Sequence, residues 1–147
     1  VYTADTDSSP SDIERFDLTP GGGIISRGNS PYHGHHRMSG NVWASPAGNI
    51  LITRGGDVFT VGDTYATDMQ FVRSLSPGNI TDLAWDVARD LVVTLEGNAI
   101  RRYRLSDYSL IDSSVLQANG RFLGRHGPAL FALLPDCNAI AKLRSAA

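Results

Sequence analysis

The feature that most constrains this chain of 147 residues is an internal repeat of roughly 42 residues. Each repeat contains an apolar strand, a turn and a second strand of alternating character. The first apolar residue of each second strand marks the repeat, and these residues are Ile13, Val58, Ile100 and Ile140. They are separated by 45, 42 and 40 residues, and two tryptophans, Trp43 and Trp85, also lie 42 residues apart. Such a period predicts units that stack on one another, because one short unit cannot bury its own faces.

The best-preserved unit predicts four strands, which are separated by turn signals. Their expected ranges are 80–86, 90–96, 99–106 and 109–116, with Gly97-Asn98 forming the tight turn between the second and third. The composition agrees, because Asp and Gly are plentiful while the chain has only two Glu and one Lys. Gly21-Gly22-Gly23 is expected to be another hairpin turn, and Trp43 and Trp85 are expected to occupy one repeated core position. Residues 136–147 could end the chain as a short helix.

Four antiparallel strands in about 42 residues is the size of one β-propeller blade. The units resemble blades of WD40-like and YVTN-type propellers, as found in divergent bacterial proteins. The Trp85-Asp86 pair ends a first strand instead of a third, so the resemblance carries the architecture only. The predicted fold class is all-β, a single partial propeller domain over residues 1–147, with a β-sandwich as the alternative. The expected blades are 1–38, 39–77, 78–119 and 120–147.

A ring usually needs four to eight blades, so these units predict either a fragment of a larger ring or several chains that close one together. The expected partners are therefore further propeller blades, in the same chain or a homo-oligomer, or another protein. A net charge of −2 and an isoelectric point near 6.0 argue against a nucleic-acid partner. No apolar run is long enough for a membrane-spanning helix. The single cysteine, Cys137, is expected at a hairpin turn, and the compartment stays open, a secreted or cell-surface location included.

The segment from residue 32 to residue 37 is the most unusual polar feature and the predicted ligand-binding loop. Its candidate residues are Tyr32, His33, His35, His36 and Arg37. Imidazole is a common metal ligand, so His33, His35 and His36 are weak candidates for a metal site. The spacing supplies no visible third ligand or orienting partner, and no cofactor is predicted.

A second polar cluster invites a calcium interpretation, because oxygen ligands at alternate positions suit that ion. Its residues are Asp5, Asp7, Ser8, Ser9 and Asp12. The cluster lacks the central glycine and the final glutamate of an EF-hand loop, and a turn capped by its own side chains explains it equally well.

Three hypotheses about function remain open. The leading one is a non-catalytic propeller module that binds a protein or another ligand, since function in such folds resides in the loops. The second is a propeller-type enzyme or metal-binding protein with its site at the channel or in the 33–37 loop. The expected channel-facing strands offer only Asn41 and Asp82, which favours the first hypothesis. The third is a structural domain of a surface or secreted bacterial protein.

Overall fold

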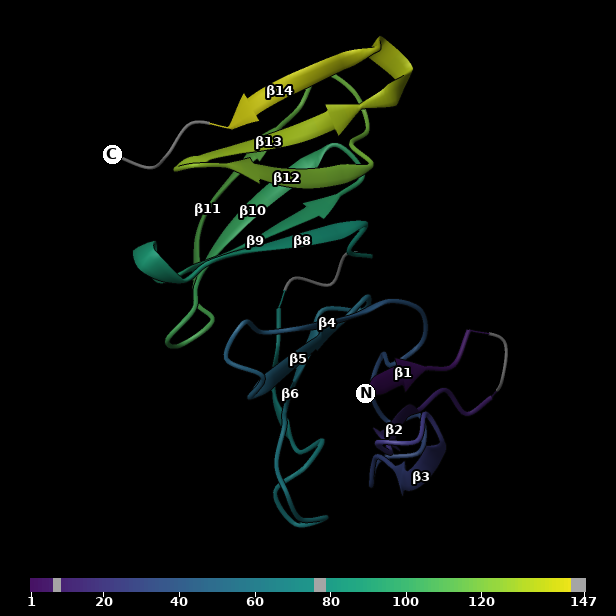
Figure 1. Ribbon diagram of the computed structural model, residues 1–147. Helices are drawn as coiled ribbons and strands as arrows, with labels where there is room; N and C mark the ends of the chain where they lie inside the picture. The colour runs from purple at the N-terminus through teal and green to yellow at the C-terminus, as the bar shows by residue number, and fades with distance from the viewer. Residues whose placement is uncertain (7–8, 76–78, 144–147) are drawn as a thin grey trace. The chain divides into compact units, whose positions relative to one another are not determined.

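The computed structural model describes residues 1–6, 9–75 and 79–143, and within them the fold is almost entirely antiparallel β-structure (Figure 1). The strands are β1 (Tyr2–Ala4), β2 (Ile13–Leu18), β3 (Ile24–Asn29), β4 (Val42–Ala44), β5 (Ile50–Thr53), β6 (Asp57–Thr60), β7 (Phe71–Ser74), β8 (Asp82–Asp86), β9 (Leu91–Glu96), β10 (Ala99–Arg104), β11 (Leu110–Val115), β12 (Phe122–His126), β13 (Ala129–Leu134) and β14 (Ala139–Leu143). Two 3-10 turns, η1 (Val87–Arg89) and η2 (Pro135–Cys137), link strands of hairpins. The all-β prediction is confirmed.

The strands form four sheets, and each sheet lies inside one of the four expected blade ranges. The two middle sheets, β4–β7 and β8–β11, have four strands in sequential order. The first sheet, β1–β3, and the last, β12–β14, have three. The chain divides into two compact units, Val1–Pro77 and Gly78–Ala147, and each is described here by itself.

The predicted hairpin turns are confirmed. Thr19 and Gly23 close the β2–β3 hairpin through a backbone hydrogen bond of 2.8 Å, which places the glycine run in the turn. Gly97 adopts φ +60°, a conformation that glycine reaches without steric cost, in the tight turn between β9 and β10. The η2 turn joins β13 to β14, so the backbone of Cys137 lies in a hairpin connection. The expected closing helix is wrong for residues 139–143, which form β14; residues 144–147 lie outside the described part.

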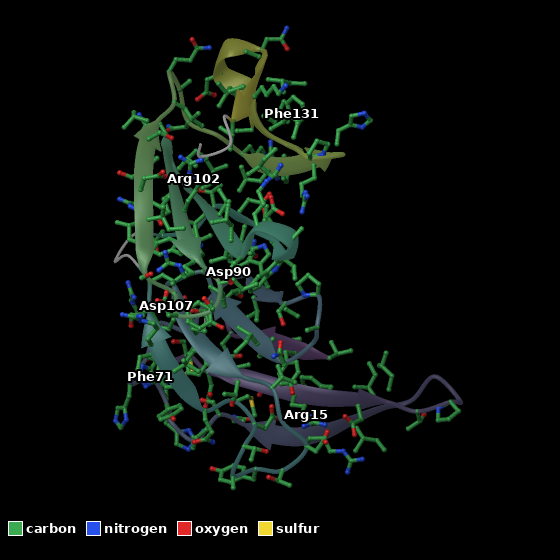
Figure 2. The ribbon with its side chains drawn as sticks, turned by 90° about the vertical axis from the view of Figure 1, so that its left-hand side faces the viewer. Arg15, Phe71, Asp90, Arg102, Asp107 and Phe131 are labelled. Atoms are coloured by element: carbon green, nitrogen blue, oxygen red, sulfur yellow. The ribbon has the colours of Figure 1, made fainter. Side chains whose placement is uncertain are left out.

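In the unit Val1–Pro77 the core lies between the first two sheets. Its buried residues come from both sheets and their connections, and they are Ile13, Met38, Leu51, Phe59 and Met69. Hydrogen bonds to a buried carboxylate also join the two sheets. Asp68 accepts one from the Tyr2 hydroxyl at 2.7 Å and one from the Arg15 guanidinium at 2.9 Å. Burial, together with the hydrogen bond to Asp68, raises the pKa of Tyr2. Arg15, labelled in Figure 2, also donates to the Gly62 carbonyl.

In the unit Gly78–Ala147 the sheet β12–β14 packs on the sheet β8–β11 (Figure 1). Val93, Leu95 and Ile100 form the buried centre, and apolar residues of the last sheet such as Leu130 and Leu143 cover it. The repeat marker Ile100 therefore faces the sheet that follows its own in the chain.

The two tryptophans are not the repeated core position that their spacing predicts. In the second sheet Trp43 pairs with Ile52, and Ile52 pairs with the marker Val58. In the third sheet Leu95 pairs with the marker Ile100 and also with Asp82. Asp82 therefore occupies the position in the third sheet that corresponds to Trp43 in the second. Trp85 lies three residues further along its strand and therefore on the opposite face. Both rings are only half-buried, so the 42-residue interval is a coincidence.

Candidate functional site

The predicted binding loop connects β3 to β4, and its five candidate residues divide into two groups. Tyr32 and His36 are half-buried against the unit Val1–Pro77, whereas His33, His35 and Arg37 are exposed. The structure therefore does not gather all five side chains around one point. Two of them support the loop, and three are accessible to a partner.

Aromatic packing holds the inner side of the loop. The His36 ring stacks on Phe71 of β7 with centroids 4.1 Å apart and planes 16° apart, and Tyr32 meets it edge-on at 4.6 Å. Figure 2 labels Phe71 in this unit. The Tyr32 hydroxyl accepts a hydrogen bond from the Phe71 backbone N–H at 2.9 Å, and Phe59 closes the cluster. This packing fixes His36 as part of the framework of the loop.

A buried carboxylate, Asp57, organises the end of the loop. It is 2% exposed and accepts hydrogen bonds from the Arg37 backbone N–H at 2.8 Å, the Arg37 guanidinium at 2.9 Å and the Ser74 hydroxyl at 2.6 Å. Burial alone would raise the pKa of Asp57, but the hydrogen bonds from Ser74 and Arg37 outweigh it and hold this pKa below its ordinary value. Thr53 donates to the Arg37 carbonyl at 2.8 Å, so the backbone of Arg37 is held at both its polar groups.

The first sheet repeats this arrangement with Asp12. This carboxylate is 3% exposed and accepts hydrogen bonds from the Ile13 N–H at 2.8 Å and from the Ser30 hydroxyl. Its second oxygen lies 3.3 Å from Nδ1 of His33, which adopts the left-handed backbone conformation at φ +42°. Ser30 is thus the counterpart of Ser74, and His33 faces Asp12 in the way that Arg37 faces Asp57.

Asp57 was not singled out by the sequence analysis, although the repeat carries a signal for it. Asp12 and Asp57 each stand immediately before a repeat marker, whereas the last two repeats have Ala99 and Ala139 in that position. A carboxylate at the start of a strand that is otherwise buried needs donors nearby, so the repeated position could have predicted both clusters.

Arg54 is a further residue that sequence reasoning missed. It lies in the turn between β5 and β6, where its backbone N–H donates to the Asn41 carbonyl at 2.8 Å. Its side chain passes over Gly40, and a Cβ at Gly40 would lie within 3 Å of Arg54. In the same way Arg37 passes over Gly55, and a Cβ at Gly55 would lie within 3 Å of Arg37. Both arginines are exposed, and no sequence signal links the two segments. We call His33, His35, Arg37 and Arg54 the basic loop surface.

The described residues contain no group of three or more His, Cys, Asp or Glu arranged to hold a metal ion. His33 and His36 face separate carboxylates, Asp12 and Asp57, in different sheets. Of the calcium candidates, Asp7 and Ser8 lie outside the described residues. Asp12 is buried beneath the loop, where one of its carboxylate oxygens accepts the Ile13 N–H.

The expected channel residue Asp82 has a structural role. Its carboxylate accepts the Leu83 N–H at 2.8 Å and the Leu123 N–H of β12 at 2.7 Å. It therefore ties the last two sheets together.

A groove of about 920 Å³ lies between the last two sheets, within the unit Gly78–Ala147. Its walls are mainly apolar, with Leu91, Val93 and Leu130 among the lining residues. Two of its cations have internal partners: Arg102, labelled in Figure 2, binds Asp112 at 2.5 Å, and Arg89 binds Asp86 at 2.7 Å.

Comparison with known proteins defines the fold and leaves the family open. No family model matches the chain, and no curated protein matches it. Among solved structures, the computationally designed protein Ika4 is similar with a TM-score of 0.63 and 16% identity, over 97% of this chain and 90% of Ika4. U3-55K is similar with a TM-score of 0.62 and 12% identity, over 96% of this chain and 47% of its own.

Sqt1 of Saccharomyces cerevisiae is similar with a TM-score of 0.51 and 11% identity, over 88% of this chain and 51% of its own. The chain thus spans about half the length of U3-55K and Sqt1. Both are WD40 β-propeller structures, and the antiparallel four-stranded sheets described above fit their blades. The fold is that of propeller blades, and the predicted class is confirmed. None of the described helical segments is long and apolar enough to cross a membrane.

Proposed function

We propose that this chain is a non-catalytic binding module of the propeller type, which recognises a segment of a partner protein at the basic loop surface. The observation that carries the proposal is the support beneath the exposed cations. Buried Asp57 fixes the backbone and side chain of Arg37, and buried Asp12 faces His33. A surface whose side chains are already ordered loses less conformational entropy when a partner binds.

The loop position favours the same function. Loops carry recognition in many folds while the sheets behind them act as a rigid support. Here the exposed side chains come from two segments, the β3–β4 loop and the β5–β6 turn, which hydrogen-bond to each other through Arg54 and Asn41. The neighbouring WD40 folds are consistent with a module of this kind.

An array of immobilised peptides of varied charge and hydropathy tests the proposal with the purified 147-residue chain. We expect a subset of peptides to retain the chain, and Arg54→Gln to reduce that retention at least threefold. Arg121→Gln serves as the matched control, since Arg121 is an exposed arginine of the other unit. Retention that is equal for both variants and the original chain would contradict a recognition role for the basic loop surface.

A further inference from the structure

The donors and acceptors of the basic loop surface are distributed unevenly. Exposed groups are guanidinium and imidazole N–H donors, whereas the two carboxylates closest to them, Asp12 and Asp57, are 3% and 2% exposed. The acceptors of Asp57 are already used by Arg37 and Ser74. A molecule that approaches this surface therefore meets hydrogen-bond donors and positive charge, with the negative charge underneath.

The arginines retain donors for a ligand. Arg37 uses one guanidinium nitrogen for Asp57, and a guanidinium has five N–H groups. Arg54 has only its backbone N–H engaged among the described hydrogen bonds, and its stem is placed by contact with Gly40. Planar guanidinium groups match carboxylates, with which they form paired charge-assisted hydrogen bonds.

The exposed and buried charges of this surface differ in sign. The guanidinium groups of Arg37 and Arg54 are exposed, whereas the carboxylates of Asp12 and Asp57 are buried. Among the described residues of the neighbouring segments, half-buried Asp5 is also charged, and its backbone carbonyl accepts the Gly40 N–H at 3.0 Å.

From these observations we infer that the partner segment is acidic, rich in Asp or Glu. This inference rests on the proposed function and adds the chemistry of the partner. A nucleic acid fits less well, because the chain has a net charge of −2. Phosphate binding over many nucleotides needs a more extended positive surface.

The experiment measures binding of a fluorescein-labelled peptide of eight Glu residues by anisotropy, at neutral pH and at low and high salt. Peptides of eight Lys and of alternating Gly and Ser, and a single-stranded oligonucleotide of eight nucleotides, are the comparison probes. We expect the Glu peptide to bind at least about threefold more tightly than each comparison probe at low salt, and more weakly in high salt.

Variants connect the result to the residues. Arg54→Glu is expected to weaken binding of the Glu peptide. Arg54→Lys is expected to weaken it less, since lysine keeps the positive charge but lacks the planar guanidinium group. Arg121→Glu, which changes the net charge equally in the other unit, is expected to have no effect. Circular dichroism of each variant confirms folding, with Arg54→Gln replacing Arg54→Glu if the latter unfolds.

Equal binding of the Glu and Lys peptides, or stronger binding of the oligonucleotide, would overturn the inference. Its failure is distinguishable from failure of the proposed function. If array peptides without acidic residues bind in a way that depends on Arg54, the binding module stands and the acidic partner does not.

Discussion

At the scale of single residues, the loop depends on buried carboxylates more than on its histidines. We expect Asp57→Ala to lower the free energy of unfolding by about 2–4 kcal/mol, because the change leaves the Arg37 and Ser74 donors without their acceptor. Urea denaturation followed by circular dichroism measures the effect. Asp17→Ala is the matched control: Asp17 binds Arg27 on the exposed surface, and we expect a much smaller loss of unfolding free energy. Equal losses would show that Asp57 contributes no more than a surface ion pair.

The lowered pKa of Asp57 makes part of this stability pH-dependent. Since the folded state holds the proton less tightly than the unfolded state, the contribution is fully present above the ordinary carboxyl range. It is lost as the pH falls through the lower pKa of the folded state. We therefore expect the difference in unfolding free energy between the original chain and Asp57→Asn to be constant from pH 7 to about pH 5. It should shrink between about pH 4 and pH 2. A difference that does not change with pH would contradict the assignment.

Sequence reasoning located the loop but not the groups that support it. His33, His35 and Arg37 could be singled out because such a cluster is rare, and all three are exposed. Asp57 was not singled out, because an isolated aspartate beside two glycines is typical of an ordinary turn. Arg54 could not be found at all, since its proximity to Arg37 depends on the packing of Gly55 and Gly40.

At the scale of elements, the β5–β6 turn needs glycine at position 55. A Cβ there would lie 2.2 Å from the Arg37 Cβ and 2.6 Å from the Arg37 carbonyl oxygen, and the latter belongs to the backbone. We expect Gly55→Ala to cost about 1–3 kcal/mol of unfolding free energy and to weaken peptide binding at the basic loop surface. Thermal and urea unfolding, with the anisotropy assay, measure the two effects.

Gly21→Ala is the control for the turn prediction. A Cβ at Gly21 meets no atom within 4 Å, and this residue lies in the exposed β2–β3 hairpin. The substitution is expected to leave both stability and binding within error. A Gly55→Ala variant as stable as Gly21→Ala would mean that the loop can move to accommodate the Cβ without a loss of unfolding free energy.

Strand number and order followed from alternation and turn residues, but strand register did not. The repeat markers were identified correctly, because each is an apolar residue at the first or second position of a strand, in β2, β6, β10 or β14. Trp43 and Trp85 were assigned to one repeated position on spacing alone. The β4–β5 and β8–β9 hairpins differ in strand register relative to the repeat markers. The two tryptophan rings therefore lie on opposite faces of their sheets.

At the scale of the whole molecule, the marker Ile140 lies on an exposed apolar face of the last sheet. Ile100 faces the sheet that follows its own, and Ile140 repeats its place in the last sheet; yet Ile140 is 69% exposed. Leu133 and Phe122 lie beside it in register on the same face, 39% and 52% exposed. Exposed rows of large apolar side chains are typical of surfaces that another protein covers. We therefore propose that this face, here called the end face, stacks on a blade of a second copy of this chain.

The end face predicts the behaviour of the 147-residue chain in solution. Because a row of apolar side chains is costly to expose, we expect the native mass to exceed the 15.8 kDa of one chain and to rise with concentration. Ile140→Lys should shift the mass toward one chain, since a charge placed in the row opposes its burial. Val87→Lys, at an exposed apolar residue of η1, should leave the mass unchanged. Light scattering distinguishes these outcomes, and a folded monomer at every concentration would mean that the end face needs no second copy.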